Sequence, residues 1–195
     1  GYFCPNVGMV EPVDACVSGY YCPGGQLNGT EVPCPVGNYC PEGSSAPLPC
    51  EAGLRQLNEG QDQCEPCPAG MFCSGNVSNL VARTTGEICP AGSFCPIQTS
   101  TSTEHLCREG TFSTREGLTN WTECDTCPPG SYCGSEGLTA VSGPCSEGYY
   151  CIGGASVSTP SDSIPFGFCG SPVCGSYDSP AGADTVTGDV CPPGF

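Results

Sequence analysis

Cysteine thiols are the side chains of this sequence whose number and spacing could support chemistry. The 195 residues include 20 cysteines but a single histidine, His105. Cys64–Cys67 and Cys124–Cys127 have the Cys-x-x-Cys spacing of half a zinc site or of a redox centre. The two pairs lie sixty residues apart in the sequence, and Pro68 or Pro128 follows where a redox motif would begin a helix. We therefore expect structural disulfides, with no metal ion and no redox cofactor.

Other catalytic chemistries lack the residues that they need. His105 lies beside Leu106 and Cys107 in a predicted loop, without the positioned acid and nucleophile of a hydrolytic triad. Asp184 and Asp189 lack the ligand spacing of a calcium loop, and no phosphate-binding glycine loop is present. The sequence thus predicts a protein that is not an enzyme and needs no cofactor.

The composition indicates an extracellular or cell-surface protein. Cysteine makes up about a tenth of the chain, whereas Leu, Ile, Val and Phe together make up only about 16%. Disulfides are therefore expected to replace a large apolar core, and they persist only in an oxidising compartment.

The net charge is −16 without any lysine, which opposes binding to nucleic acid or to anionic membranes. We interpret the acidity as a means of solubility, and the alternative is loose association with Ca²⁺ or a cationic partner. No apolar run is long enough to span a bilayer.

Three Asn-x-Ser/Thr sequons agree with passage through a secretory route. They begin at Asn28, Asn76 and Asn120, each after a cysteine motif in the variable part of a repeat. These asparagines are the predicted sites of N-linked glycans.

The elements that must position the cysteines are short tandem repeats. The phrase Cys-x-x-Gly-x-(Tyr/Phe)-Cys recurs at a period of about eighteen residues. Its opening cysteines are Cys16, Cys34, Cys50, Cys67, Cys89, Cys107, Cys127 and Cys145. The copies from Cys50 and Cys107 lose the closing cysteine and gain Cys64 and Cys124 instead.

Each motif position has a physical interpretation. Cys-Pro-x-Gly suits a type I turn, and the invariant glycine predicts a positive φ or a close approach of backbone to a disulfide. The aromatic residue is expected to cover a disulfide or the next repeat, the alternative being a ligand-binding stripe. The predicted fold class is a small disulfide-rich protein: tandem cysteine-knotted repeats of turns and short β-ribbons, elongated, with little regular secondary structure.

Two disulfide schemes are compatible with the spacing, which does not decide between them. The first pairs opening cysteines forward: Cys16–Cys22, Cys34–Cys40, Cys50–Cys64, Cys67–Cys73, Cys89–Cys95, Cys107–Cys124, Cys127–Cys133 and Cys145–Cys151, with Cys169–Cys174 as a separate loop. The rival pairs each closing cysteine with the next opening one, as in Cys4–Cys16, and must close Cys64–Cys67 across two residues. We favour the forward scheme because such tight loops are more typical of redox motifs.

The segments CEAGLRQLNEGQDQCEPCPAGMFC and CREGTFSTREGLTNWTECDTCPPGSYC resemble the cysteine-rich repeats of ephrin-receptor-like and tumour-necrosis-factor-receptor-like modules. In those families the first cysteine bonds to the one after the loop, which implies Cys50–Cys64 and Cys107–Cys124. The form CPVGNYCPEGSSAPLPCEAG is similar to repeat arrays in extracellular proteins of protists and algae, including flagellar-hair (mastigoneme) proteins. That second resemblance implies a structural role, whereas the first implies a receptor.

The predicted organisation has three parts: a partial repeat at 1–15, tandem repeats at 16–151, and a Ser/Thr/Pro-rich linker with an irregular cysteine loop at 152–195, ending in a partial repeat. IQTSTSTE after Cys95 also has a linker-like composition. The terminal half-motifs lead us to expect a segment of a longer array, in which Cys4 and Cys191 pair outside the segment.

These observations together predict a structural subunit of a secreted, glycosylated extracellular filament, hair or coat. The alternative is a receptor-like ectodomain that binds a protein ligand along its repeats. The expected partners are further copies of the same chain, its N-linked glycans, and O-linked glycans on the Ser/Thr/Pro-rich stretch.

Overall fold

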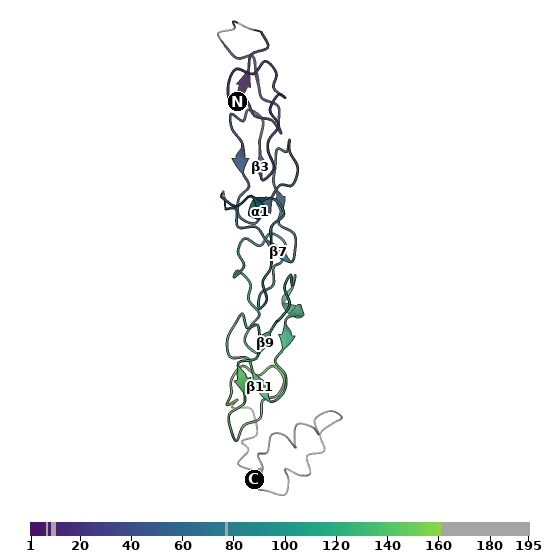
Figure 1. Ribbon diagram of the computed structural model, residues 1–195, viewed down its shortest axis with the longest axis vertical. Coiled ribbons are helices and arrows are strands. Elements are labelled where there is room, and N and C mark those ends of the chain that lie inside the picture. The colour runs from purple at the N-terminus through teal and green to yellow at the C-terminus, as the bar shows by residue number, and fades with distance from the viewer. Residues whose placement is uncertain (7, 9–10, 77, 161–195) are drawn as a thin grey trace. The chain divides into compact units, whose positions relative to one another are not determined.

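The computed structural model describes residues 1–6, 8, 11–76 and 78–160, and Figure 1 gives the course of the chain. Regular secondary structure in these residues is short: every strand has two residues, the α-helix has four and the 3₁₀-helix has three. Disulfides and two-stranded antiparallel ribbons make up most of the ordered structure. The predicted fold class, a small disulfide-rich protein with little regular secondary structure, is confirmed.

Each ribbon pairs the two residues after a motif glycine with the two residues before the next opening cysteine. The pairs are β1 (Tyr2–Phe3) with β2 (Asp14–Ala15), β3 (Asn38–Tyr39) with β4 (Leu48–Pro49), β5 (Leu54–Arg55) with β6 (Glu65–Pro66), β7 (Met71–Phe72) with β8 (Glu87–Ile88), β9 (Thr111–Phe112) with β10 (Asp125–Thr126), and β11 (Ser131–Tyr132) with β12 (Gly143–Pro144). Two other repeats have single bridges at the same place, Tyr20 with Pro33 and Ser93 with Leu106. The strands stay this short because a turn glycine precedes each first strand and a disulfide-bonded cysteine follows each second one.

The chain divides into two compact units. The first comprises Gly1–Cys89 and Cys95–Glu104, and the second comprises Pro90–Phe94 and His105–Phe195, of which residues after 160 are not described. The division therefore passes through the repeat that Cys89 opens.

Cysteine sulfur forms the core of both units. Among the residues that the structure describes, all but three of the buried apolar ones are cysteines, and the exceptions are Ala82, Leu118 and Ala155. Larger apolar side chains such as Ile97 and Ile152 are exposed to about two thirds. Cross-linking thus takes the place of apolar burial, as the composition predicts.

The one α-helix among the described residues lies in the longest repeat. Asn79 caps α1 (Leu80–Arg83) by accepting hydrogen bonds from the Val81 and Ala82 amides. Arg83 Nη1 donates to Gly37 O at 3.1 Å and to Asn38 Oδ1 at 3.0 Å. This insertion, drawn across the middle of Figure 1, is therefore attached to a repeat some 45 residues earlier in the sequence.

Both stretches with a linker-like composition contain folded residues. Thr99 is 1% exposed, and its carbonyl accepts a hydrogen bond from the Cys73 amide at 3.0 Å. The carboxylate of Glu104 accepts from the Ser100 amide and hydroxyl, each at 2.8 Å. In the second stretch, Ala155 is buried and its carbonyl accepts from the Cys133 amide. Residues 97–104 and 152–160 thus differ from the linker interpretation, because the preceding repeats bind their backbone.

Candidate functional site

Apart from Cys4, the cysteines that the structure describes are joined in eight disulfides, each closing one repeat. The pairs are Cys16–Cys22, Cys34–Cys40, Cys50–Cys64, Cys67–Cys73, Cys89–Cys95, Cys107–Cys124, Cys127–Cys133 and Cys145–Cys151. This pairing is the forward scheme. Cys4 is the one free thiol of the described residues, and Cys169, Cys174 and Cys191 lie outside them.

A repeated backbone hydrogen-bond ladder joins each repeat to the next. The amide of a motif glycine donates to the carbonyl at the closing position of the following repeat, over 2.8–3.0 Å. In the first unit these bonds are Gly19 to Cys40, Gly37 to Gln56, Gly53 to Cys73 and Gly70 to Cys95; in the second they are Gly92 to Ser113, Gly110 to Cys133 and Gly130 to Cys151. The carbonyl of the same glycine accepts from the next opening cysteine's amide, as between Cys34 and Gly19 at 2.9 Å. Both backbone groups of the motif glycine are therefore used in stacking.

The motif position must be glycine for two separate reasons. All eight motif glycines have φ between 73° and 84°, as the sequence predicts. Several also face a loop carbonyl two repeats further along. A Cβ on Gly19 would lie 2.2 Å from Gly60 O, and one on Gly110 would lie 2.4 Å from Gly154 O. The repeats of Gly19 and Gly110 are thus packed against their second neighbours as well as their first, and the group approached at these positions is a backbone carbonyl.

Buried polar side chains replace the missing cysteine in the two repeats with large loops. Gln56 and Ser113 stand at the closing position and are 2% and 0% exposed. Gln56 Nε2 donates to Gln63 O at 2.7 Å, and Ser113 Oγ accepts from the Arg115 amide at 3.1 Å. Each side chain therefore braces the loop that the longer disulfide closes. The sequence analysis missed these two residues, although a polar residue at the closing position of a cysteine repeat was a usable signal.

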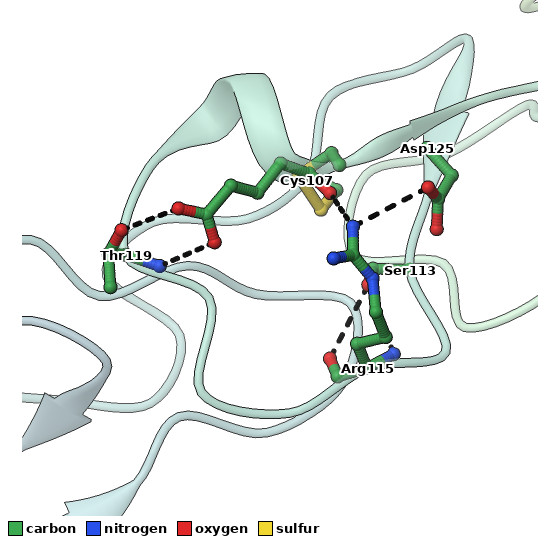
Figure 2. Close-up of polar contacts among 7 residues, drawn as sticks. Cys107, Ser113, Arg115, Thr119 and Asp125 are labelled. Atoms are coloured by element: carbon green, nitrogen blue, oxygen red, sulfur yellow. Dashed lines mark hydrogen bonds and ion pairs between the residues drawn. A yellow bond between two sulfur atoms is a disulfide. The ribbon is translucent and has the colours of Figure 1, made fainter.

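A network of polar contacts organises the loop between Cys107 and Cys124, as Figure 2 shows. Arg115 Nη2 donates to the Glu123 carbonyl and lies 3.5 Å from Asp125 Oδ1. The Glu123 carboxylate accepts from the Thr119 hydroxyl at 2.6 Å and from the Thr119 amide at 3.2 Å. The bond from the Thr119 hydroxyl, followed by the one from its amide, lowers the pKa of Glu123 below its ordinary value. The loop is consequently held by polar contacts at its surface as well as by the Cys107–Cys124 disulfide that closes it.

The three sequon asparagines are exposed and share one local conformation. The side-chain oxygen of each accepts a hydrogen bond from the amide two residues later: Asn28 from Thr30 at 3.1 Å, Asn76 from Ser78 at 3.0 Å and Asn120 from Thr122 at 3.2 Å. In this turn the side-chain oxygen makes the bond, so the side-chain nitrogen, to which a glycan would be attached, takes no part in it. Glycosylation at these residues stays a prediction.

The motif aromatics are half-buried rather than gathered into an open site. The series comprises Tyr21, Tyr39, Phe72, Phe94, Phe112, Tyr132 and Tyr150. Phe94 stacks on His105, with ring centroids 5.4 Å apart. Arg55, which takes the aromatic position in its repeat, donates through Nη1 to Thr85 O at 3.4 Å. His105 thus has a packing partner, and Phe94 and Arg55 each contact a later segment of the chain.

Within the described ranges, no three His, Cys, Asp or Glu side chains come together in a way that could hold a metal ion. Nor does this part of the chain contain a helix of the length and apolar character needed to cross a membrane. Comparison of the sequence with protein-family models and with curated proteins gives no match. The candidate functional feature is therefore the stacked, disulfide-closed repeat itself.

Proposed function

We propose that this chain is a structural segment of a secreted, glycosylated extracellular filament, hair or coat. The observation that carries the proposal is the backbone ladder, which has the same donors and acceptors at successive repeat junctions in both units. Because the bonds use backbone groups, the ladder tolerates changes of side chain, including Gln56 and Ser113 in place of cysteine. Repeats joined in this way can be added in series without a new interface.

The chemistry of the surface supports the same role. The disulfides are suited to an oxidising extracellular setting. Without them, the reduced chain would lack a sufficient core. The net charge of −16 opposes non-specific lateral aggregation of repeats that expose apolar side chains. Glycans at Asn28, Asn76 and Asn120 would add to this effect without disturbing the ladder, since all three side chains lie outside it.

A second candidate function is that of a receptor-like ectodomain. One observation favours it: the loop between Cys107 and Cys124 is rigidly braced and carries the exposed side chains of Arg115, Trp121 and Asp125. Aromatic and arginine side chains on a fixed loop are common anchors in protein interfaces.

Electron microscopy of the native material, labelled with an antibody against the repeats, distinguishes the two functions. The structural function predicts that the label follows filaments, hairs or a coat with a regular axial repeat. Label confined to dispersed monomers or to isolated membrane-attached molecules would contradict it and favour the receptor.

A further inference from the structure

The only tryptophan of the chain is held in an exposed position as the middle residue of a sequon. Trp121 has 59% of its surface exposed and begins the 3₁₀-helix η1 (Trp121–Glu123). Asn120, the sequon asparagine, is the N-cap of that helix. Exposure of an indole to this extent is costly in water, so the side chain is suited to a partner that covers it.

The surrounding loop keeps Asn120 and Trp121 in fixed positions. The Cys107–Cys124 disulfide closes the loop three residues after Trp121. The Glu123 carboxylate, at the end of η1, accepts from the Thr119 hydroxyl just before the helix, and Arg115 donates to the Glu123 carbonyl. An indole presented by a braced loop loses little side-chain entropy when a partner packs on it.

The amide of Asn120 is already oriented for substitution. Its Oδ1 accepts from the Thr122 amide, which restrains the side-chain amide and leaves Nδ2 outside that bond. Asn120 and Trp121 are both exposed and their Cα atoms are about 3.8 Å apart, so a sugar ring on Nδ2 has room to turn toward the neighbouring indole. Attachment joins Nδ2 to the anomeric carbon of a lipid-pyrophosphate glycosyl donor; the lipid pyrophosphate leaves and Nδ2 loses one proton.

We propose that the innermost sugar of an N-glycan on Asn120 packs on the face of Trp121. The C–H groups on one side of a pyranose ring form an apolar surface, and the indole face offers a matching apolar, electron-rich one. The partner is thus the glycan that the adjacent residue carries, and the contact orders the glycan on the loop. The other two sequons have Gly29 and Val77 at the position of Trp121, so this contact is specific to the third sequon. The inference rests on the glycosylation that forms part of the proposed function.

The single tryptophan makes the contact directly measurable. The full chain is secreted from eukaryotic cells, occupancy at Asn120 is determined by mass spectrometry, and quenching of tryptophan fluorescence by acrylamide is measured. Removing the whole glycan with an amidase is expected to raise the quenching constant about twofold, because one face of an indole that is 59% exposed becomes accessible. Trimming to a single sugar with an endoglycosidase is expected to leave the constant unchanged.

Two variants complete the test. Thr122→Ala removes the third sequon but keeps Asn120 and the amide that bonds to it, and it is expected to reproduce the effect of the amidase. Thr30→Ala removes the first sequon and is the matched control, expected to leave tryptophan quenching unchanged. Equal quenching constants with and without the glycan, at an occupied Asn120, would overturn the proposal and leave Trp121 open to a protein ligand. An unoccupied Asn120 would also overturn it, while the microscopy test of the filament would be unaffected.

Discussion

Substitution of the two glycines that meet between second-neighbour repeats provides a test of how the repeats stack. Gly19 and Gly60 both have positive φ, at 84° and 72°. A Cβ on Gly19 would lie 2.2 Å from Gly60 O, whereas for a Cβ on Gly60 the nearest atom is Gly19 O at 4.0 Å. Gly19→Ala and Gly60→Ala therefore introduce the same backbone strain, but only the first introduces a collision.

The expected magnitudes differ accordingly. Placing an L-residue in the left-handed region costs about 1–2 kcal/mol, and the loss of flexibility in the unfolded chain offsets about 0.4–1 kcal/mol of that cost. Gly60→Ala should therefore cost about 1 kcal/mol. Gly19→Ala adds overpacking of about 1–3 kcal/mol and weakens two backbone hydrogen bonds worth about 1 kcal/mol each. The total destabilisation by Gly19→Ala should be about 3–5 kcal/mol.

Amide hydrogen exchange on the oxidised chain is the appropriate assay, because a repeat array need not unfold in two states. The Cys34 amide, which donates to Gly19 O, reports on this junction. A difference of about 3 kcal/mol corresponds to more than a hundredfold faster exchange in Gly19→Ala than in Gly60→Ala. Equal exchange in the two variants would refute second-neighbour packing. Gly110→Ala and Gly154→Ala form the equivalent pair in the second unit, with the collision at Gly110.

Three further predictions concern single side chains and the shape of the chain. Gln98 has φ 70° where other repeats have glycine, so Gln98→Gly should stabilise its repeat by about 0.5–1 kcal/mol, measured by the same exchange method; destabilisation would show that its side chain makes a necessary contact. The lowered pKa of Glu123 means that its contribution to stability is present above the carboxyl's unfolded pKa and is lost as the pH falls through the folded pKa. Thr119→Val should raise the pKa of Glu123 toward its ordinary value in an NMR titration, and an unchanged pKa would exclude the hydroxyl as the main cause. The repeat pattern of the sequence predicts an elongated chain, for which solution scattering should give a radius of gyration well above the ~16 Å of a globular chain of this length; a value near 16 Å would contradict that prediction.

The local features of the fold could be predicted from the sequence because they depend on short spacings. A cysteine six residues after another, with Pro-x-Gly between them, leaves few conformations apart from a turn that brings the two thiols together. The positive φ of the motif glycine follows from the same turn. The exchange of the closing cysteine for Cys64 or Cys124 was likewise visible as a covariation between repeats.

The remaining features depend on contacts between repeats, which spacing does not encode. The carbonyl of Gly60 reaches Gly19 only because the repeats stack with second neighbours in contact. Thr99 belongs to a stretch whose composition suggests a linker, yet its carbonyl is the acceptor that the Cys73 amide needs. Gln56 and Ser113 have no obvious role in the sequence until the closing position is identified as a buried one.

Peptide mapping of the secreted protein under non-reducing conditions tests the central claim. That claim is that each disulfide lies within one repeat, as in the forward scheme, and that the backbone hydrogen-bond ladder joins one repeat to the next. The structure predicts eight linked pairs, of which Cys50–Cys64 and Cys107–Cys124 are the most informative because the rival scheme must instead join Cys64 to Cys67 and Cys124 to Cys127. A Cys64–Cys67 or Cys124–Cys127 bridge would contradict the claim, since it would close the chain between repeats rather than within them.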